Sequence, residues 1–224
     1  PRPVSSAASD VYKRQTYKEL KNYSNQVANG LIELGCKPDT RIAYYGKNSD
    51  FFFEVLIGTL KSNTVTVGVN WRLAPPEVSY VLNDSESEVL FVGADFYPVI
   101  DQILEDLPKI KKVVAIDGDH ENYQDYISWR NSQNSANPEI KSSPNDDILQ
   151  LYTSGTTGHP KGVQLTNENF AAANESIDGI VPFEEGSTNL VCMPGYHVAG
   201  TNWGIWGYIF AVSYTHLRAH ETSQ

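Results

Sequence analysis

The chain has 224 residues, of which 40% are apolar, 20% charged and 11% aromatic, a composition typical of a folded globular protein. Its 17 basic and 27 acidic residues give a net charge of −10, which argues against nucleic-acid binding because that needs Lys and Arg to neutralise phosphates. The two cysteines, Cys36 and Cys192, suggest no disulfide framework. No apolar stretch reaches the roughly 18–20 residues of a transmembrane helix. We therefore expect a cytoplasmic protein.

Regular patterning begins at Thr16, which has capping-box spacing to Glu19 and starts a helix that ends at Gly35. Downstream, short β-branched runs alternate with helical segments. Strands are expected at Ile42–Tyr45, Thr64–Val69, Glu88–Val92 and Lys112–Ile116, and helices from Ser49 to Leu60, Pro76 to Asn83 and Tyr97 to Leu107. This alternation predicts an α/β fold with βα units around a largely parallel sheet.

Residues 130–147 are rich in Asn, Ser and Pro, and predict an exposed linker or long loop. The pattern then resumes through the rest of the chain. Strands are expected at Ile148–Tyr152, Val163–Leu165 and Thr188–Met193, and helices at Glu168–Ile177 and from about Thr201 to Val212.

A segment rich in glycine and hydroxyl groups lies between two of these strands. It reads Thr153-Ser154-Gly155-Thr156-Thr157-Gly158-His159-Pro160-Lys161-Gly162. Glycines let backbone N–H groups approach an anion, hydroxyls can donate hydrogen bonds to phosphate oxygens, and a lysine adds a positive charge. Composition alone would also fit a flexible surface turn. The residues predicted to bind ATP phosphates are Thr153, Ser154, Gly155, Thr156, Thr157, Gly158 and Lys161.

The spacing within this segment excludes two common nucleotide motifs. Gly155 and Gly158 are too close together for G-x-x-x-x-G-K-[ST], and Lys161 follows a proline. The order also differs from G-x-G-x-x-G. A strand on each side predicts a hairpin-like loop rather than a strand-to-helix turn.

The order S-G-T-T-G-x-P-K-G resembles the signature of the adenylate-forming superfamily, which includes acyl- and aryl-CoA synthetases, firefly luciferases and peptide-synthetase adenylation domains. The resemblance covers roughly Thr16 to Val212 and implies the N-terminal part of that superfamily's large domain, truncated. Residues 70–73, Glu77 and residues 80–85 also resemble a stretch of acyl-CoA synthetases. For these we favour a structural role, as a turn followed by a helix packed on the sheet.

A second motif, residues 193–200, resembles the family segment P-x-[FY]-H-x-x-G. The resemblance places Tyr196 and His197 beside the nucleotide and acyl pocket. Gly195 departs from the larger apolar residue often found at that point, which affects the expected shape of the pocket. The alternative for His197 is a hydrogen-bonded structural residue.

The resemblance implies a two-step ligase reaction, with ATP, Mg²⁺ and coenzyme A as cofactors or co-substrates and a small-molecule carboxylate as substrate. The carboxylate attacks the α-phosphate of MgATP, and a thiol then takes the acyl group. A non-catalytic nucleotide-binding module and a peptide-synthetase adenylation domain remain alternatives. The Y-G-x-T-E and S-T-G-D motifs and the distal lysine of the family are not found. We therefore expect no catalytic residue and no activity in this chain, whose magnesium ligands would mostly lie outside it.

The two ends depart from the pattern of the rest. Residues 1–15 and 213–224 resemble read-through of sequencing adapters in translated environmental assemblies, so we expect both to be non-native tails around a partial AMP-binding domain at 16–212. His216 and His220 have the i, i+4 spacing of a metal pair. We assign them no metal role because no third ligand lies nearby in the sequence.

Overall fold

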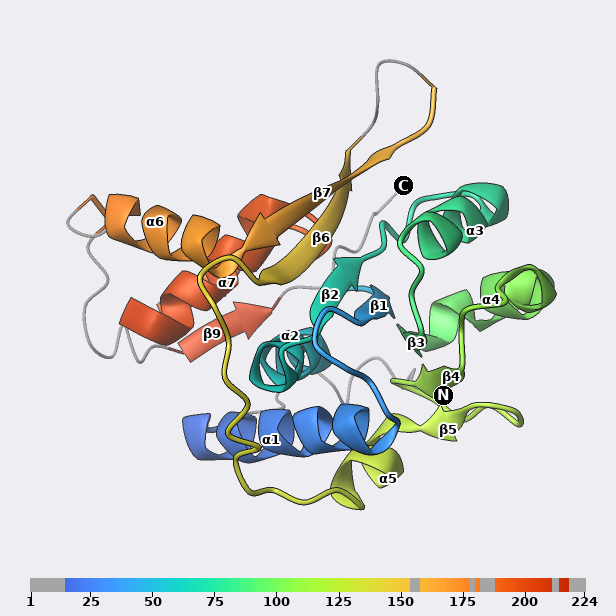
Figure 1. Ribbon diagram of the computed structural model, residues 1–224, viewed down its shortest axis with the longest axis horizontal. Coiled ribbons are helices and arrows are strands. Elements are labelled where there is room, and N and C mark those ends of the chain that lie inside the picture. The colour runs from blue at the N-terminus through green and yellow to red at the C-terminus, as the bar shows by residue number, and fades with distance from the viewer. Residues whose placement is uncertain (1–14, 154–157, 178–179, 182–187, 211–213, 218–224) are drawn as a thin grey trace, which may run out of the picture.

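The computed structural model describes residues 15–153, 158–177, 180–181, 188–210 and 214–217. Its centre is a seven-stranded sheet with the strand order β5-β4-β3-β1-β2-β6-β7 (Figure 1). The strands are β1 Arg41–Tyr45, β2 Val65–Gly68, β3 Val89–Val92, β4 Lys112–Ala115, β5 Gln124–Asp125, β6 Asp147–Thr153 and β7 Lys161–Thr166. All neighbouring pairs are parallel except β6 and β7, which are antiparallel. The predicted, largely parallel α/β sheet is confirmed.

Helices cover both faces of this sheet (Figure 1). The helices of this part are α1 Tyr17–Glu33, α2 Asp50–Ser62, α3 Pro75–Asp84, α4 Tyr97–Ile103 and α5 Tyr126–Asn131. Two short 3₁₀ turns, Ala94–Phe96 and Leu104–Asp106, flank α4. Successive strand residues point to opposite faces, so Ile42 and Tyr44 pack with α1, α2 and α5, whereas Ala43 and Tyr45 pack with α3 and α4. Both faces are thus buried, as parallel strands require.

Helix starts follow the local sequence closely, with one exception. The expected capping box of α1 is present, because the Glu19 N–H donates to Thr16 Oγ1 and the Thr16 N–H donates to Glu19 Oε2. Ser49 occupies the expected N-cap position of α2, but its side chain caps no backbone group. Its hydroxyl instead pairs with the Tyr44 hydroxyl at 2.8 Å. The Ser49 hydroxyl therefore bonds to the Tyr44 side chain of β1 instead of capping the backbone of α2.

The segment predicted to be an exposed linker at 130–147 begins in α5 and is bound to α1. Amide side chains of α1 donate to its backbone carbonyls: Asn25 to Ser135, Gln26 to Gln133, and Asn29 to Asn134 and Ala136. These bonds satisfy carbonyls that have no place in a sheet or helix. The segment is a loop, as predicted, but α1 fixes its path.

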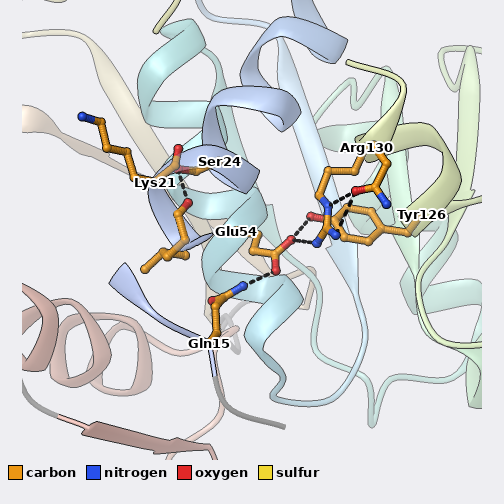
Figure 2. Close-up of polar contacts among 8 residues, drawn as sticks. Gln15, Lys21, Ser24, Glu54, Tyr126 and Arg130 are labelled. Atoms are coloured by element: carbon orange, nitrogen blue, oxygen red, sulfur yellow. Dashed lines mark hydrogen bonds and ion pairs between the residues drawn. The ribbon is translucent and has the colours of Figure 1, made fainter. Parts of the chain in front are cut away.

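A buried ion pair joins α2 to α5 (Figure 2). Glu54 Oε2 accepts hydrogen bonds from Arg130 Nη1 and from the Tyr126 hydroxyl, each at 2.7 Å, and Glu54 Oε1 accepts one from Gln15 Nε2 at 2.5 Å. The Glu54 and Arg130 side chains are 0% and 6% exposed. The Arg130 guanidinium also lies over the Tyr23 ring at 3.7 Å. Burial would lower the pKa of Arg130, but Glu54 raises it above the ordinary value.

The C-terminal part adds α6 Asn167–Ile177, β8 Thr188–Val191, α7 Val198–Phe210 and β9 Tyr214–Leu217. The strands β8 and β9 pair in parallel as a separate two-stranded sheet. Helix α7 begins three residues before the predicted Thr201.

The proposed tail boundaries at 15 and 213 stay predictions, although Gln15 and β9 lie within the proposed tails. Within the described ranges, no helix is both long and apolar enough to cross a membrane.

Candidate functional site

The carboxyl ends of β1, β2 and β6 lie together at one edge of the sheet. The three strands are parallel neighbours, with Tyr44 opposite Gly68 and Gly68 opposite Leu151. In open α/β sheets, ligands bind at this edge. The glycine-rich loop leaves the sheet here, directly after Thr153, and β7 returns antiparallel with Lys161 opposite Thr153 (Figure 1). The predicted hairpin-like loop is therefore confirmed.

The structure describes part of the predicted phosphate-binding set. Thr153, Gly158 and Lys161 are described, whereas Ser154, Gly155, Thr156 and Thr157 lie outside the described residues. Gly158 has a φ of +114°, and a Cβ added there would meet nothing within 4 Å. This left-handed backbone favours glycine. The backbone conformation at position 158, rather than a lack of room for a side chain, therefore favours glycine there.

Lys161 is exposed at the start of β7. Within the part of the chain that the structure describes, no carboxylate forms an ion pair with it. Its ammonium group is therefore available to an anion at the loop. A flexible lysine suits phosphate as a mobile point charge.

The turn that carries Tyr196 and His197 is fastened to the same edge by Asn48. The Asn48 side chain donates to the Met193 carbonyl and accepts from the Gly195 N–H, each at 2.8 Å. Asn48 lies between β1 and α2, so this two-point contact fixes the turn beside the carboxyl end of β1. The Gly195 carbonyl in turn accepts a hydrogen bond from the Thr201 hydroxyl of α7 at 2.7 Å.

Tyr196 packs over the end of β2. A Cβ added at Gly68 would lie 2.9 Å from both Tyr196 Cα and Leu151 Cδ2, so only glycine permits this approach. The Tyr196 ring meets Trp71 edge-on, with centroids 6.4 Å apart. Burial raises the pKa of Tyr196, and the charge of Arg72 opposes that rise. The phenol therefore stays protonated at neutral pH.

His197 is exposed, and its Nδ1 accepts the N–H of Ala199 at 3.2 Å. This bond helps to satisfy the first turn of α7, where backbone N–H groups lack helical partners. Because Nδ1 is an acceptor, a neutral His197 carries its proton on Nε2. The hydrogen bond at Nδ1 thus supports the interpretation of His197 as a structural residue. The Nε2–H of the same ring is still available for a role in the pocket.

Sequence reasoning missed Asn48 and Gly68, which hold the Tyr196 turn. Their signal was positional: each lies at or just after the carboxyl end of a predicted parallel strand. Residues 70–85 form the predicted turn and helix, which is α3. Its start is fixed by the Ala74 N–H, which donates to Glu77 Oε2 at 2.8 Å.

The described residues offer phosphate ligands more readily than metal ligands. Among them, no three His, Cys, Asp or Glu side chains gather closely enough to hold a metal ion. A hydroxyl, a left-handed glycine and a lysine suit a nucleoside triphosphate, whose phosphates themselves carry the metal. The arrangement therefore fits an ATP phosphate subsite.

The fold is that of the N-terminal domain of adenylate-forming enzymes. It matches the N-terminal domain of FACL13 from Mycobacterium tuberculosis with a TM-score of 0.83 and 30% identity, over 95% of this chain and 52% of that one. It matches the anthranilate CoA ligase AuaEII, solved with anthranoyl-AMP, with a TM-score of 0.86 and 25% identity, over 92% of this chain and 41% of that one.

The family follows from the sequence comparison. Residues 2–222 match the model of the AMP-binding enzymes, so the chain belongs to that family. It is 36% identical to a fatty acid–acyl-carrier-protein ligase from Streptomyces coeruleorubidus, over 99% of this chain and 42% of that protein. The chain thus spans about two fifths of this relative's length. The AMP-binding family is thus shown for this chain, and this relative is named as an acyl ligase.

Proposed function

We propose that this chain is the ATP phosphate-binding part of an AMP-forming acid–thiol ligase. In the first step, a carboxylate oxygen attacks the α-phosphorus of MgATP, forming the acyl adenylate and releasing pyrophosphate. In the second, a thiol attacks the acyl carbon and AMP leaves. Coenzyme A is the proposed thiol; acyl-carrier protein is the competing acceptor because the Streptomyces relative is named for it.

The observation that carries this proposal is the position of the loop between Thr153 and Lys161. It leaves a parallel sheet at the carboxyl edge, with a left-handed Gly158 and a lysine without a carboxylate partner among the described residues. Negative charge accumulates on the leaving pyrophosphate during the first step. Lys161 and the loop N–H and hydroxyl groups would stabilise that charge, and removing one such donor costs about 10²-fold in rate.

The Tyr196 turn supplies the second element of the proposal. Tyr196 and His197 are proposed to border the nucleotide and acyl pocket, because their turn is held beside β1 and β2 at the same edge as the loop. Mg²⁺ is proposed to enter with ATP and to complete its ligand shell from residues beyond the described ones. Bound there, it would offset the charge on the phosphates. The two free thiols, Cys36 and Cys192, fit a reducing compartment, for which we propose the cytoplasm.

The test is carboxylate-dependent ATP–pyrophosphate exchange by the complete enzyme that contains this chain. Lys161→Ala should reduce the exchange rate about 10²-fold, whereas Lys37→Ala should leave it unchanged. Lys37 is also an exposed lysine, and it lies just before β1, at the end of the sheet opposite the loop. Undiminished exchange in Lys161→Ala would refute the assignment. We also expect the 224-residue chain alone to show no exchange.

Two outcomes separate the alternatives. A non-catalytic nucleotide-binding module would bind ATP but support no exchange with any carboxylate. A peptide-synthetase adenylation domain would support exchange with amino acids and would transfer the acyl group to a carrier domain rather than to free coenzyme A. Adding coenzyme A or acyl-carrier protein after exchange is established then identifies the acceptor.

A further inference from the structure

Helix α3 contacts the end of the glycine-rich loop that leads into β7, through the side chain of Tyr80. The Tyr80 ring stacks on the His159 ring, with centroids 4.8 Å apart and planes 20° apart. The Tyr80 hydroxyl lies 3.3 Å from the Pro160 carbonyl oxygen, to which it donates. Both contacts fall on the loop residues immediately before Lys161. Tyr80 is half-buried, whereas His159 is exposed.

The base of the same hairpin is tied to the same helix one turn further on. The Tyr152 hydroxyl of β6 donates to Asp84 Oδ2 at 2.6 Å and accepts from Gln150 Nε2 at 3.0 Å. The other carboxylate oxygen, Asp84 Oδ1, lies 3.4 Å from the Tyr80 hydroxyl and can also accept a hydrogen bond from it. Tyr80 and Asp84 are four residues apart and therefore share one face of α3. Two successive turns of α3 thus contact the hairpin, one at the loop end before β7 and one at Tyr152 of β6.

The hydroxyls keep their donor role over the pH range of an assay. Desolvation, together with the charge and hydrogen bond of Asp84, raises the pKa of Tyr80 above its ordinary value of 10.0. Burial and Asp84 likewise raise the pKa of Tyr152. Neither phenol ionises near neutral pH, so the Pro160 carbonyl and the Asp84 carboxylate keep their donors.

We propose that Tyr80 is a positioning residue for ATP: it braces the end of the phosphate-binding loop through His159 and Pro160 and so sets the position of Lys161. The inference rests on the proposed function of the loop and extends it to a residue of helix α3. It also gives His159, at the variable position of the S-G-T-T-G-x-P-K-G order, a specific task as the surface against which Tyr80 stacks.

The test uses the complete enzyme and measures KM for ATP and KM for the carboxylate separately in the exchange assay. Tyr80→Leu removes ring and hydroxyl, and should raise KM for ATP about 10-fold, as expected for losing one ring pair and one hydrogen bond. Tyr80→Phe keeps the ring and should raise it about 3-fold. KM for the carboxylate should stay unchanged, because the lost contacts are with His159 and Pro160 beside Lys161.

A double-mutant cycle with His159→Ala tests whether Tyr80 acts through His159. In the His159→Ala background, the effect of Tyr80→Leu on KM for ATP should shrink from about 10-fold to about 3-fold, since the stacking partner is already gone. Asn83→Ala is the matched control on the same helix. It removes a hydrogen bond from Asn83 to the Asp106 carbonyl at 2.9 Å, away from the loop, and should leave KM for ATP unchanged.

Three outcomes would overturn the proposal: an unchanged KM for ATP in Tyr80→Leu, equal rises in both KM values, or an equal rise in Asn83→Ala. Hydrogen exchange of the His159 and Lys161 backbone amides gives a readout that needs no catalysis. Tyr80→Leu should accelerate both about 10-fold, and unchanged rates would also refute the brace. If the wild-type enzyme shows no exchange reaction, the proposed function fails, while this amide measurement still decides the inference about Tyr80.

Discussion

Removing the charge of Arg130 should destabilise the contact between α2 and α5 strongly. Arg130→Met keeps most of the side-chain length but leaves the Glu54 carboxylate, which is 0% exposed, with donors from Tyr126 and Gln15 alone. Breaking a buried ion pair by deleting one partner costs about 3–5 kcal/mol. Loss of the guanidinium over the Tyr23 ring adds about 0.5–2 kcal/mol. We expect a total of about 4 kcal/mol or more.

The reciprocal and double variants separate the ion pair from simple packing. Glu54→Leu leaves Arg130 buried without its carboxylate and should cost a similar amount. The double variant Glu54→Leu/Arg130→Met has neither charge, and apolar replacement of a buried pair is often nearly neutral. Its loss should therefore be smaller than the sum of the two single losses by about 3 kcal/mol.

The assay is native-state hydrogen exchange in the complete enzyme, read at the backbone amides of α2 and α5, which reports the free energy of local opening. Lys109→Met is the control, because Lys109 and Glu86 form a pair at 3.5 Å with side chains 57% and 70% exposed. That change should stay within about 0.5 kcal/mol. Additive single-variant losses, or an Arg130→Met loss no larger than the control's, would refute the reasoning.

Two more predictions concern a thiol and a glycine. Burial and the nearby Glu88 raise the pKa of Cys36 from 9.0 to about 11. At pH 9 the thiolate fraction of Cys36 is therefore about fifty-fold below that of an unperturbed thiol. Iodoacetamide should label the exposed Cys192 before Cys36, as measured by mass spectrometry. The raised pKa also makes the free energy of unfolding fall as pH rises from 9 to 11, because the Cys36 thiol loses its proton at lower pH in the unfolded chain than in the folded one. Rapid labelling of Cys36 at pH 9 in the folded enzyme would contradict the raised pKa. Gly68→Ala should displace Tyr196 and raise KM for the carboxylate in the exchange assay, and an unchanged value would argue against an acyl pocket there.

Much of the sheet could be predicted because its strands and helices have local signals. The helix beginning at Thr16 has its capping box, and the alternation of β-branched and helical runs predicts parallel pairing. Helix α5 was missed because its six residues are too few to show a helical period, and its buried Arg130 is of a residue type that is rarely buried. Its partner Glu54 lies 76 residues earlier, and no local pattern joins the two.

The candidate site, like the sheet, was predicted only in part. The order of residues 153–162 predicted the loop, its hairpin form and its family. The supports of the loop were not predictable, because Tyr80 and His159 are 79 positions apart in the sequence and meet only once α3 has packed on the sheet. Asn48 reaches across 145 residues to Met193. The roles assigned to Ser154, Gly155, Thr156 and Thr157 stay predictions.

The position of β7 explains why the loop needs a support from α3. It is the outermost strand of the described sheet, with β6 as its sheet neighbour, and half of its residues are exposed and none is buried. Electrostatic stabilisation of a leaving pyrophosphate requires donors that are already in place when charge develops. Helix α3 contacts both sides of this hairpin, through Tyr80 at His159 and Pro160 before β7 and through Asp84 at Tyr152 of β6. On the proposed role of Tyr80, these contacts hold the donors in place beside Lys161.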